Sequence, residues 1–75
     1  MSEKEQLKQE FQWIKYRIHV LDTIEKKLLL MRSMAERAKT SKLSEIEIQD
    51  LNYKINNLAG QVRALDEESK RIDSK

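Results

Sequence analysis

The near absence of helix-breaking residues constrains this fold more than any other feature. The 75 residues include no proline and one glycine, Gly60. Proline and glycine interrupt helices most strongly, so long helices can run through most of the chain. Hydrophobic residues make up 39% of the sequence and recur at helical spacing, which favours folded helices over disorder. Gly60 itself could allow another helix to approach closely, mark a kink, or end a helix early.

Two capping signals divide the chain into two helices. Ser2 precedes Glu5 by three residues, and Ser44 precedes Glu47 by the same spacing. In such a capping box, the serine and glutamate side chains bind the free N–H groups that begin a helix. The elements predicted within a single domain, residues 1–75, are helix one at about 3–39, a turn at about 40–44 and helix two at about 45–72.

Each predicted helix carries an apolar stripe. The stripe of helix one is Leu7, Phe11, Ile14, Ile18, Leu21, Ile24, Leu28, Met31, Ala35 and Ala38. The stripe of helix two is Ile48, Leu51, Ile55, Leu58, Val62, Leu65 and Ile72, with Ser69 as its one polar member. A short turn makes the helices antiparallel, so the numbers of facing residues have a constant sum. The sequence therefore predicts an all-α, antiparallel two-helix hairpin with coiled-coil-like packing.

One register pairs the two stripes along their length, with residue numbers that sum to 83. The predicted pairs are Ala35 with Ile48, Leu28 with Ile55, Leu21 with Val62, Ile18 with Leu65, Ile14 with Ser69, and Phe11 with Ile72. This register leaves further apolar residues of helix one unpaired: Trp13, Val20, Leu29, Leu30 and Met34. A helix that is apolar over more than one stripe is usually buried by more than one neighbour.

The unpaired apolar residues predict self-association. A chain of this length gains little stability from a single core, and it holds no cysteine for a disulfide, so oligomerisation is the remaining means of stabilisation. We therefore predict a homo-oligomer, with a dimer of hairpins in a four-helix bundle favoured. The predicted interface residues are Trp13, Val20, Leu29, Leu30 and Met34.

The sequence contains no combination of residues typical of an active site, a metal centre or a cofactor site. His19 is the only histidine, and no cysteine is present to join it in binding a metal. The consecutive acidic residues 66–68 diverge around a helix axis instead of converging on a cation. Phosphate-binding loops and nucleophile motifs are also missing. We expect a non-enzymatic protein with no catalytic residues, no metal and no cofactor.

Charge and hydropathy restrict the partners. The net charge of +2 is small, and acidic residues are interleaved with the lysines of helix one, which disfavours nucleic acid as a partner. The longest aliphatic run, residues 28–31, is too short to span a membrane, and the first residues do not resemble a signal peptide. The expected location is the cytoplasm, with no membrane partner. A nucleic-acid-associated helical protein is the second alternative function.

Helix two offers a polar face to a partner. The candidate partner face consists of Gln49, Asn52, Tyr53 and Asn56. The function predicted first is a small protein–protein interaction module, a self-associating adaptor or regulator with a further, unknown protein partner. The aromatic end of helix one, at Trp13, is a second candidate anchor for that partner.

The start of helix two resembles a known family. It reads Ile48-Gln49-Asp50-Leu51-Asn52, where small helical-hairpin phosphatases of the sporulation response regulator carry Ser-Gln-Glu-Leu-Asp. The resemblance extends loosely to Ile24-Glu25 and Leu43-Ser44, and it covers less than half of the chain. The family's Ser and Asp positions hold Ile48 and Asn52, and an amide cannot do the work of a carboxylate. The resemblance implies a regulator that docks on a phosphorylated signalling protein without phosphatase activity.

Overall fold

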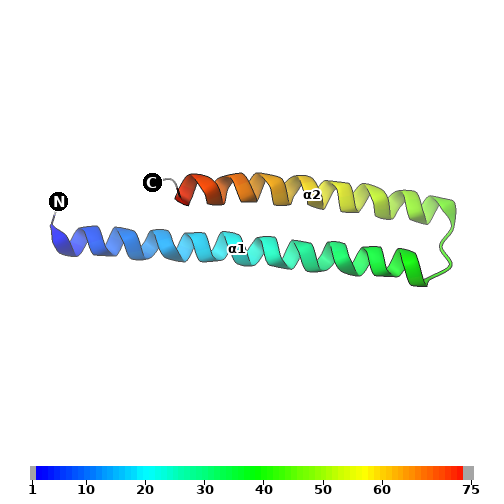
Figure 1. The fold of residues 1–75 in the computed structure, drawn as a ribbon, viewed down its shortest axis with the longest axis horizontal. Helices are drawn as coiled ribbons and strands as arrows, with labels where there is room; N and C mark the ends of the chain where they lie inside the picture. Colours follow the sequence, from blue (N-terminus) through cyan, green and yellow to red (C-terminus); the bar gives the residue numbers. More distant parts are fainter. Residues whose placement is uncertain (1, 74–75) are drawn as a thin grey trace.

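The chain is a hairpin of two long helices. The computed structural model describes residues 2–73, and the side chains of residues 2–71. Helix α1 spans Glu3–Thr40 and helix α2 spans Glu45–Asp73. The helices lie antiparallel in a rod with extents of 62 × 16 × 13 Å, and the N-terminal end of α1 extends beyond α2 (Figure 1). The predicted all-α helical hairpin is confirmed.

Serine caps the start of both helices. At α1, the Ser2 hydroxyl accepts a hydrogen bond from the Glu5 backbone N at 3.2 Å. At α2, the Ser44 hydroxyl accepts from the Glu47 backbone N at 3.2 Å, while the Glu47 carboxylate accepts from the Ser44 backbone N at 3.2 Å. This second capping box is complete in both directions, so it sets where α2 begins after the turn at residues 41–44.

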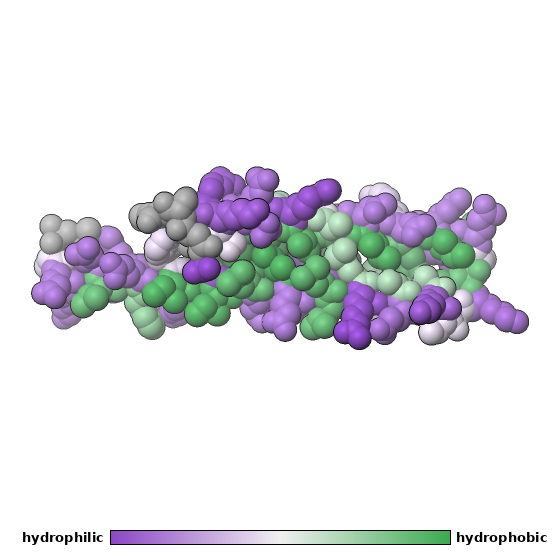
Figure 2. Space-filling view, in the orientation of Figure 1, coloured by the Kyte–Doolittle hydropathy of each residue, from purple (hydrophilic) through white to green (hydrophobic). Residues whose placement is uncertain are grey.

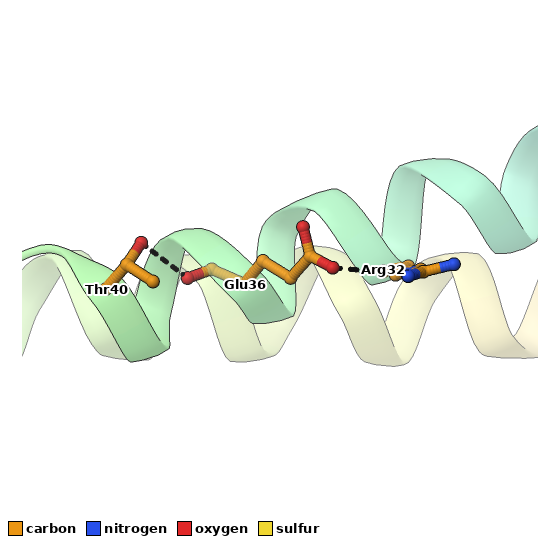
Figure 3. A network of polar contacts seen from close by, with 3 residues as sticks. All are labelled: Arg32, Glu36 and Thr40. Atoms are coloured by element: carbon orange, nitrogen blue, oxygen red, sulfur yellow. Dashed lines mark hydrogen bonds and ion pairs between the residues drawn. The ribbon is translucent and has the colours of Figure 1, made fainter.

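Helix α1 ends in a short network of polar contacts (Figure 3). Arg32 Nε donates to Glu36 Oε1 at 3.1 Å, and Thr40 Oγ1 donates to the Glu36 backbone carbonyl at 2.8 Å. Ser41 then adopts an extended backbone, and its N–H donates to the Arg37 carbonyl at 3.0 Å. The Ser41 N–H thus bonds the first of the four carbonyls at the end of the helix that have no partner inside it. The chain can therefore turn back towards α2.

The apolar stripe predicted for α2 faces α1. Leu51 is 7% exposed, and Ser69, the polar member of the stripe, is buried. Between them the stripe is half-buried at Ile55, Leu58, Val62 and Leu65. The prediction for this face of α2 is thus confirmed from Leu51 to Ser69. Ile48, near the turn, is exposed, and Ile72 lies outside the described side chains.

The face of α1 that packs against α2 differs from the predicted one. Val20 is 3% exposed, the lowest value among the described hydrophobic side chains. Half-buried residues at helical spacing share its face: Trp13, Ile24, Lys27, Met31 and Met34. Except for Ile24 and Met31, the predicted stripe is exposed: Leu7, Phe11, Ile14, Ile18, Leu21, Leu28, Ala35 and Ala38. The predicted packing face of α1 is therefore wrong.

Two hydrogen bonds join the helices. Lys27 Nζ donates to Gln61 Oε1, and Tyr16 Oη donates to Glu68 Oε1 at 2.8 Å. The residue numbers of these pairs sum to 88 and 84, against the predicted 83. Five predicted pairs have an α1 member that is exposed and so lies outside the contact with α2: Ala35–Ile48, Leu28–Ile55, Leu21–Val62, Ile18–Leu65 and Ile14–Ser69. The sixth pair, Phe11–Ile72, lies outside the described side chains.

Lys27 gives the physical reason for the difference. Lys27 lies in the middle of the stripe that contains Val20. A charged residue there argues against burial of that stripe, so the sequence pattern favours burial of the stripe that contains Phe11 and Ile18. In the structure, Lys27 is half-buried and its amine reaches the side of α2 to bind Gln61. A long lysine side chain can cover apolar surface with its methylene groups while its charge stays in water. The packed face therefore tolerates Lys27.

Gly60 lies inside a continuous helix. Helix α2 runs through it to Asp73, so the early end considered for helix two does not occur. A Cβ atom placed on Gly60 would meet no atom within 4 Å outside its own helix backbone. The hairpin itself therefore does not require glycine at this position.

We expect Gly60→Ala to stabilise the hairpin by about 0.5–1 kcal/mol, because alanine has the higher helix propensity and restricts the unfolded chain. The thermal unfolding midpoint should rise by about 2–8 °C, measured by circular dichroism. The matched control, Ala64→Gly at an exposed site of the same helix, should lower the midpoint. A lower midpoint for Gly60→Ala would show that another chain packs closely there.

Candidate functional site

The five residues predicted to form an oligomer interface fall into two groups. Val20 is buried by α2, and Trp13 and Met34 are half-buried on the same face of α1. Leu29 and Leu30 are exposed. The prediction that Val20 lies outside the hairpin contact is wrong, because α2 packs on the stripe that contains it. Of the five, only Leu29 and Leu30 are exposed to a further chain.

A continuous apolar strip of α1 is left uncovered by α2. Its residues are separated by four, three, four and three positions and are 45–63% exposed: Leu7, Phe11, Ile14, Ile18 and Leu21. We call these five residues the open seam. Figure 2 shows hydrophobic surface in a band along α1 from its N-terminal part to the middle of the rod. Contiguous apolar patches of this kind typically bind another surface.

The sequence prediction placed the open seam inside the hairpin and so missed this surface. Both stripes of α1 have heptad spacing, and the open seam has the more regular apolar pattern. One signal in the sequence opposes the predicted pairing. The second apolar stripe of α1, with Trp13, Val20 and Met34, is also able to pack against helix two.

Charged residues border the open seam on both sides. Glu3, Glu10 and Arg17 follow one edge. Lys8, Lys15 and Asp22 follow the other edge, and all six residues are exposed. Lys15 Nζ lies 5.6 Å from the centroid of the Phe11 ring, which is within the range of a cation–π contact. The Lys15 amine therefore already lies next to the apolar surface.

The candidate partner face of α2 lies on the side of that helix away from α1. Its four residues, Gln49, Asn52, Tyr53 and Asn56, are all exposed. Within residues 2–71 their side chains make no hydrogen bond or ion pair with one another. Tyr53 is the one large apolar group on this face, and it is surrounded by amides. The arrangement presents hydrogen-bonding groups around one aromatic ring.

Tyr16 connects α1 to α2. Its hydroxyl donates to the Glu68 carboxylate, and this hydrogen bond is the main cause that raises the pKa of Tyr16 above its ordinary value. The neutral hydroxyl is favoured because a phenolate beside Glu68 would place two negative charges together. The contact holds the C-terminal half of α2 against α1 while the open seam stays exposed.

The side chains that could bind a metal do not cluster in the described part of the chain. Among residues 2–73, no three His, Asp or Glu side chains lie close enough together to hold a metal ion. His19 is exposed, and its backbone carbonyl accepts a hydrogen bond from the Thr23 hydroxyl at 2.9 Å. In the acidic run 66–68, Asp66 pairs with Lys70 at 3.2 Å and Glu68 accepts the hydrogen bond from Tyr16. These acidic groups thus have different partners.

Comparisons with protein-family models, with curated proteins and with solved structures found no match for this chain. Neither helix has, within the described residues, a stretch that is long and apolar enough to cross a membrane. The open seam of α1 and the candidate partner face of α2 are the two surfaces on which a function can be proposed.

Proposed function

We propose that this chain is a non-enzymatic protein–protein interaction module that self-associates through the open seam of α1. The observation that carries the proposal is the exposure of five large apolar side chains at coiled-coil spacing on one helix. Fully burying one such side chain contributes about 1.5–3 kcal/mol, and each is about half exposed in the single hairpin. Pairing two open seams removes this surface from water in both chains.

The small core of the hairpin supports the same proposal. Val20 and Leu51 are the hydrophobic side chains that are buried among residues 2–71. A two-helix domain of this length rarely gains more than about 3–5 kcal/mol from its own core, so a second copy would add stability that the single chain lacks. The proposed assembly is a dimer of hairpins with four helices, acting in the cytoplasm as an adaptor or regulator.

Light scattering over a wide concentration range tests the proposal. The unmodified chain should approach twice its 9.0 kDa mass. Phe11→Glu should shift the dissociation constant by more than about tenfold towards the monomer, because a carboxylate would have to leave water in the paired seam. Phe11 is 63% exposed in the hairpin, so this variant should keep its helical circular dichroism.

Two further variants make this test specific. Ile46→Glu introduces the same charge at a site on α2 that is 78% exposed, and it should leave the mass unchanged. Leu30→Glu alters a residue of the sequence-predicted interface outside the open seam. A monomeric mass for the unmodified chain at every concentration would refute self-association. Dissociation by Leu30→Glu, with Phe11→Glu still dimeric, would favour the interface predicted from the sequence.

The candidate partner face of α2 supports a second binding surface. Gln49, Asn52, Tyr53 and Asn56 lie on a different helix from the open seam and are exposed in the hairpin. Self-association through α1 would therefore leave them accessible to another protein. We propose this face for the partner that an adaptor or regulator requires, including a phosphorylated signalling protein.

A further inference from the structure

We infer that the second copy binds the open seam in parallel and in register, so that each seam residue meets the same residue of the other chain. This inference rests on the proposed self-association and specifies its orientation. Its basis is the order of charges along the two edges of the open seam, taken with the exposure of those edges in the hairpin.

The apolar residues of the open seam fit the inner positions of a coiled coil. Phe11 and Ile18 occupy the a positions of the heptad. Leu7, Ile14 and Leu21 occupy the d positions. A β-branched residue at a followed by leucine at d favours two-stranded parallel coiled coils, as at Ile18 followed by Leu21. The seam therefore fits one further helix of the same sequence.

Parallel pairing brings opposite charges together along the whole seam. In a parallel coiled coil, the g residue of one chain lies beside the e residue five positions later in the other chain, and such pairs set orientation. The g and e residues that meet are Glu3 with Lys8, Glu10 with Lys15, and Arg17 with Asp22. Each pair has opposite signs and occurs twice in a two-fold symmetric dimer. In the single hairpin, the Lys15 amine already lies over the ring of Phe11. It is therefore at the edge of the seam where it would meet Glu10 of the second copy.

Antiparallel pairing gives no such agreement of charges. In that arrangement, each edge of the seam meets the same edge of the other copy. In the register centred between Phe11 and Ile14, Lys8 meets Lys15 while Glu10 meets Arg17, so unfavourable contacts offset favourable ones. In the register centred between Ile14 and Ile18, Lys8 meets Asp22, but Lys15 and Arg17 each meet their own copies. Like charges in such contacts are unfavourable, so the parallel arrangement is the one that matches all the charges along the seam.

The ends of the contact are also marked in the sequence. Lys4 and Glu25 occupy the a positions on either side of the open seam, and each would face its own copy in a parallel dimer. Helix α2 covers the Val20 face of α1, which is a different face from the open seam. The contact proposed for the second copy therefore extends from Leu7 to Leu21.

Single cysteine variants test the orientation. Leu7→Cys and Leu21→Cys are prepared separately, and each is oxidised at concentrations where the unmodified chain is dimeric. The chain contains no other cysteine, so a disulfide can only join two copies at that position. The two sites lie about 21 Å apart on a helix that rises 1.5 Å per residue. No single antiparallel register can bring both residues to their own copies.

Parallel pairing predicts disulfide-linked dimers for both variants, and none for the control Ile46→Cys on α2. Disulfide linkage in only one variant or in neither would overturn the parallel arrangement, provided that the unmodified chain is dimeric by light scattering. Self-association itself would still hold in that case. A monomeric unmodified chain would overturn the proposed function itself. The two failures are therefore distinguishable.

Charge reversal gives an independent measurement on the same dimer. Glu10→Lys and Lys15→Glu should each weaken dimerisation about fivefold at low salt, because each places like charges at two contacts. The double variant should restore the original dissociation constant, since opposite charges meet again. In an antiparallel dimer these residues lie on opposite edges and do not meet. Failure of the double variant to restore dimerisation would therefore contradict the inference.

Discussion

Val20→Glu is expected to unfold the hairpin, whereas Ile18→Glu, two residues away, is expected to keep its helical structure. Val20 is enclosed by α2, and a carboxylate there would be desolvated without a partner, at a cost of several kcal/mol. That cost is comparable with the whole stability expected of so short a chain. Far-ultraviolet circular dichroism and thermal unfolding, at matched concentrations, measure the difference.

Ile18 provides the matched comparison because it carries the same substitution on the same helix. It is 60% exposed, so its glutamate can stay in water when the chain is a single hairpin. Ile18→Glu should match Phe11→Glu in both helical content and mass, since both lie on the open seam. Under the pairing predicted from the sequence, Ile18 faces α2 and Val20 does not. The outcomes of the two variants would then be exchanged.

Leu51→Ala is expected to lower the free energy of unfolding by about 2–4 kcal/mol. The side chain of Leu51 is buried between the helices, and alanine removes its contacts and leaves a void. Leu43 and Glu47 line a hollow beside Leu51 near the turn, so closure of the void is limited by the turn. Urea unfolding should show a lower midpoint with an unchanged slope.

Ile46→Ala is the control for this measurement. Ile46 lies on α2 one turn before Leu51 and is largely exposed, so its truncation should change the free energy of unfolding by less than about 0.5 kcal/mol. Equal effects of the two substitutions would show that α2 does not pack with its predicted face. That result would contradict the face of α2 on which the sequence and the structure agree.

Local sequence determined the helices and the turn. The capping boxes at Ser2 and Ser44 act within three residues, so they operate before any tertiary contact is made. The absence of proline lets each helix continue without interruption, and α2 even continues through Gly60. The exposed pairs at four-residue spacing, such as Asp50 with Lys54, also act within one helix.

The packing face of α2 was determined by the sequence because α2 has a single apolar stripe. Leu51, Leu58 and Leu65 have no competing apolar face, since the opposite side carries amides and charges. Any antiparallel partner must cover that stripe to remove it from water. The prediction of this face therefore did not depend on which face of α1 packs against it, and it is correct from Leu51 to Ser69 even though the predicted face of α1 is not.

The packing face of α1 was decided only by the tertiary structure. Helix α1 carries two apolar stripes, and periodicity alone favours the open seam because Lys27 interrupts the other. Packing against α2 selected the stripe of Val20, since the Lys27 amine reaches Gln61 and stays in water. A helix with two apolar stripes can bury one of them against the second helix of its own chain. Periodicity does not determine which of the two is buried. The structure shows that α2 covers Val20 and that the more regular stripe is exposed in the single hairpin.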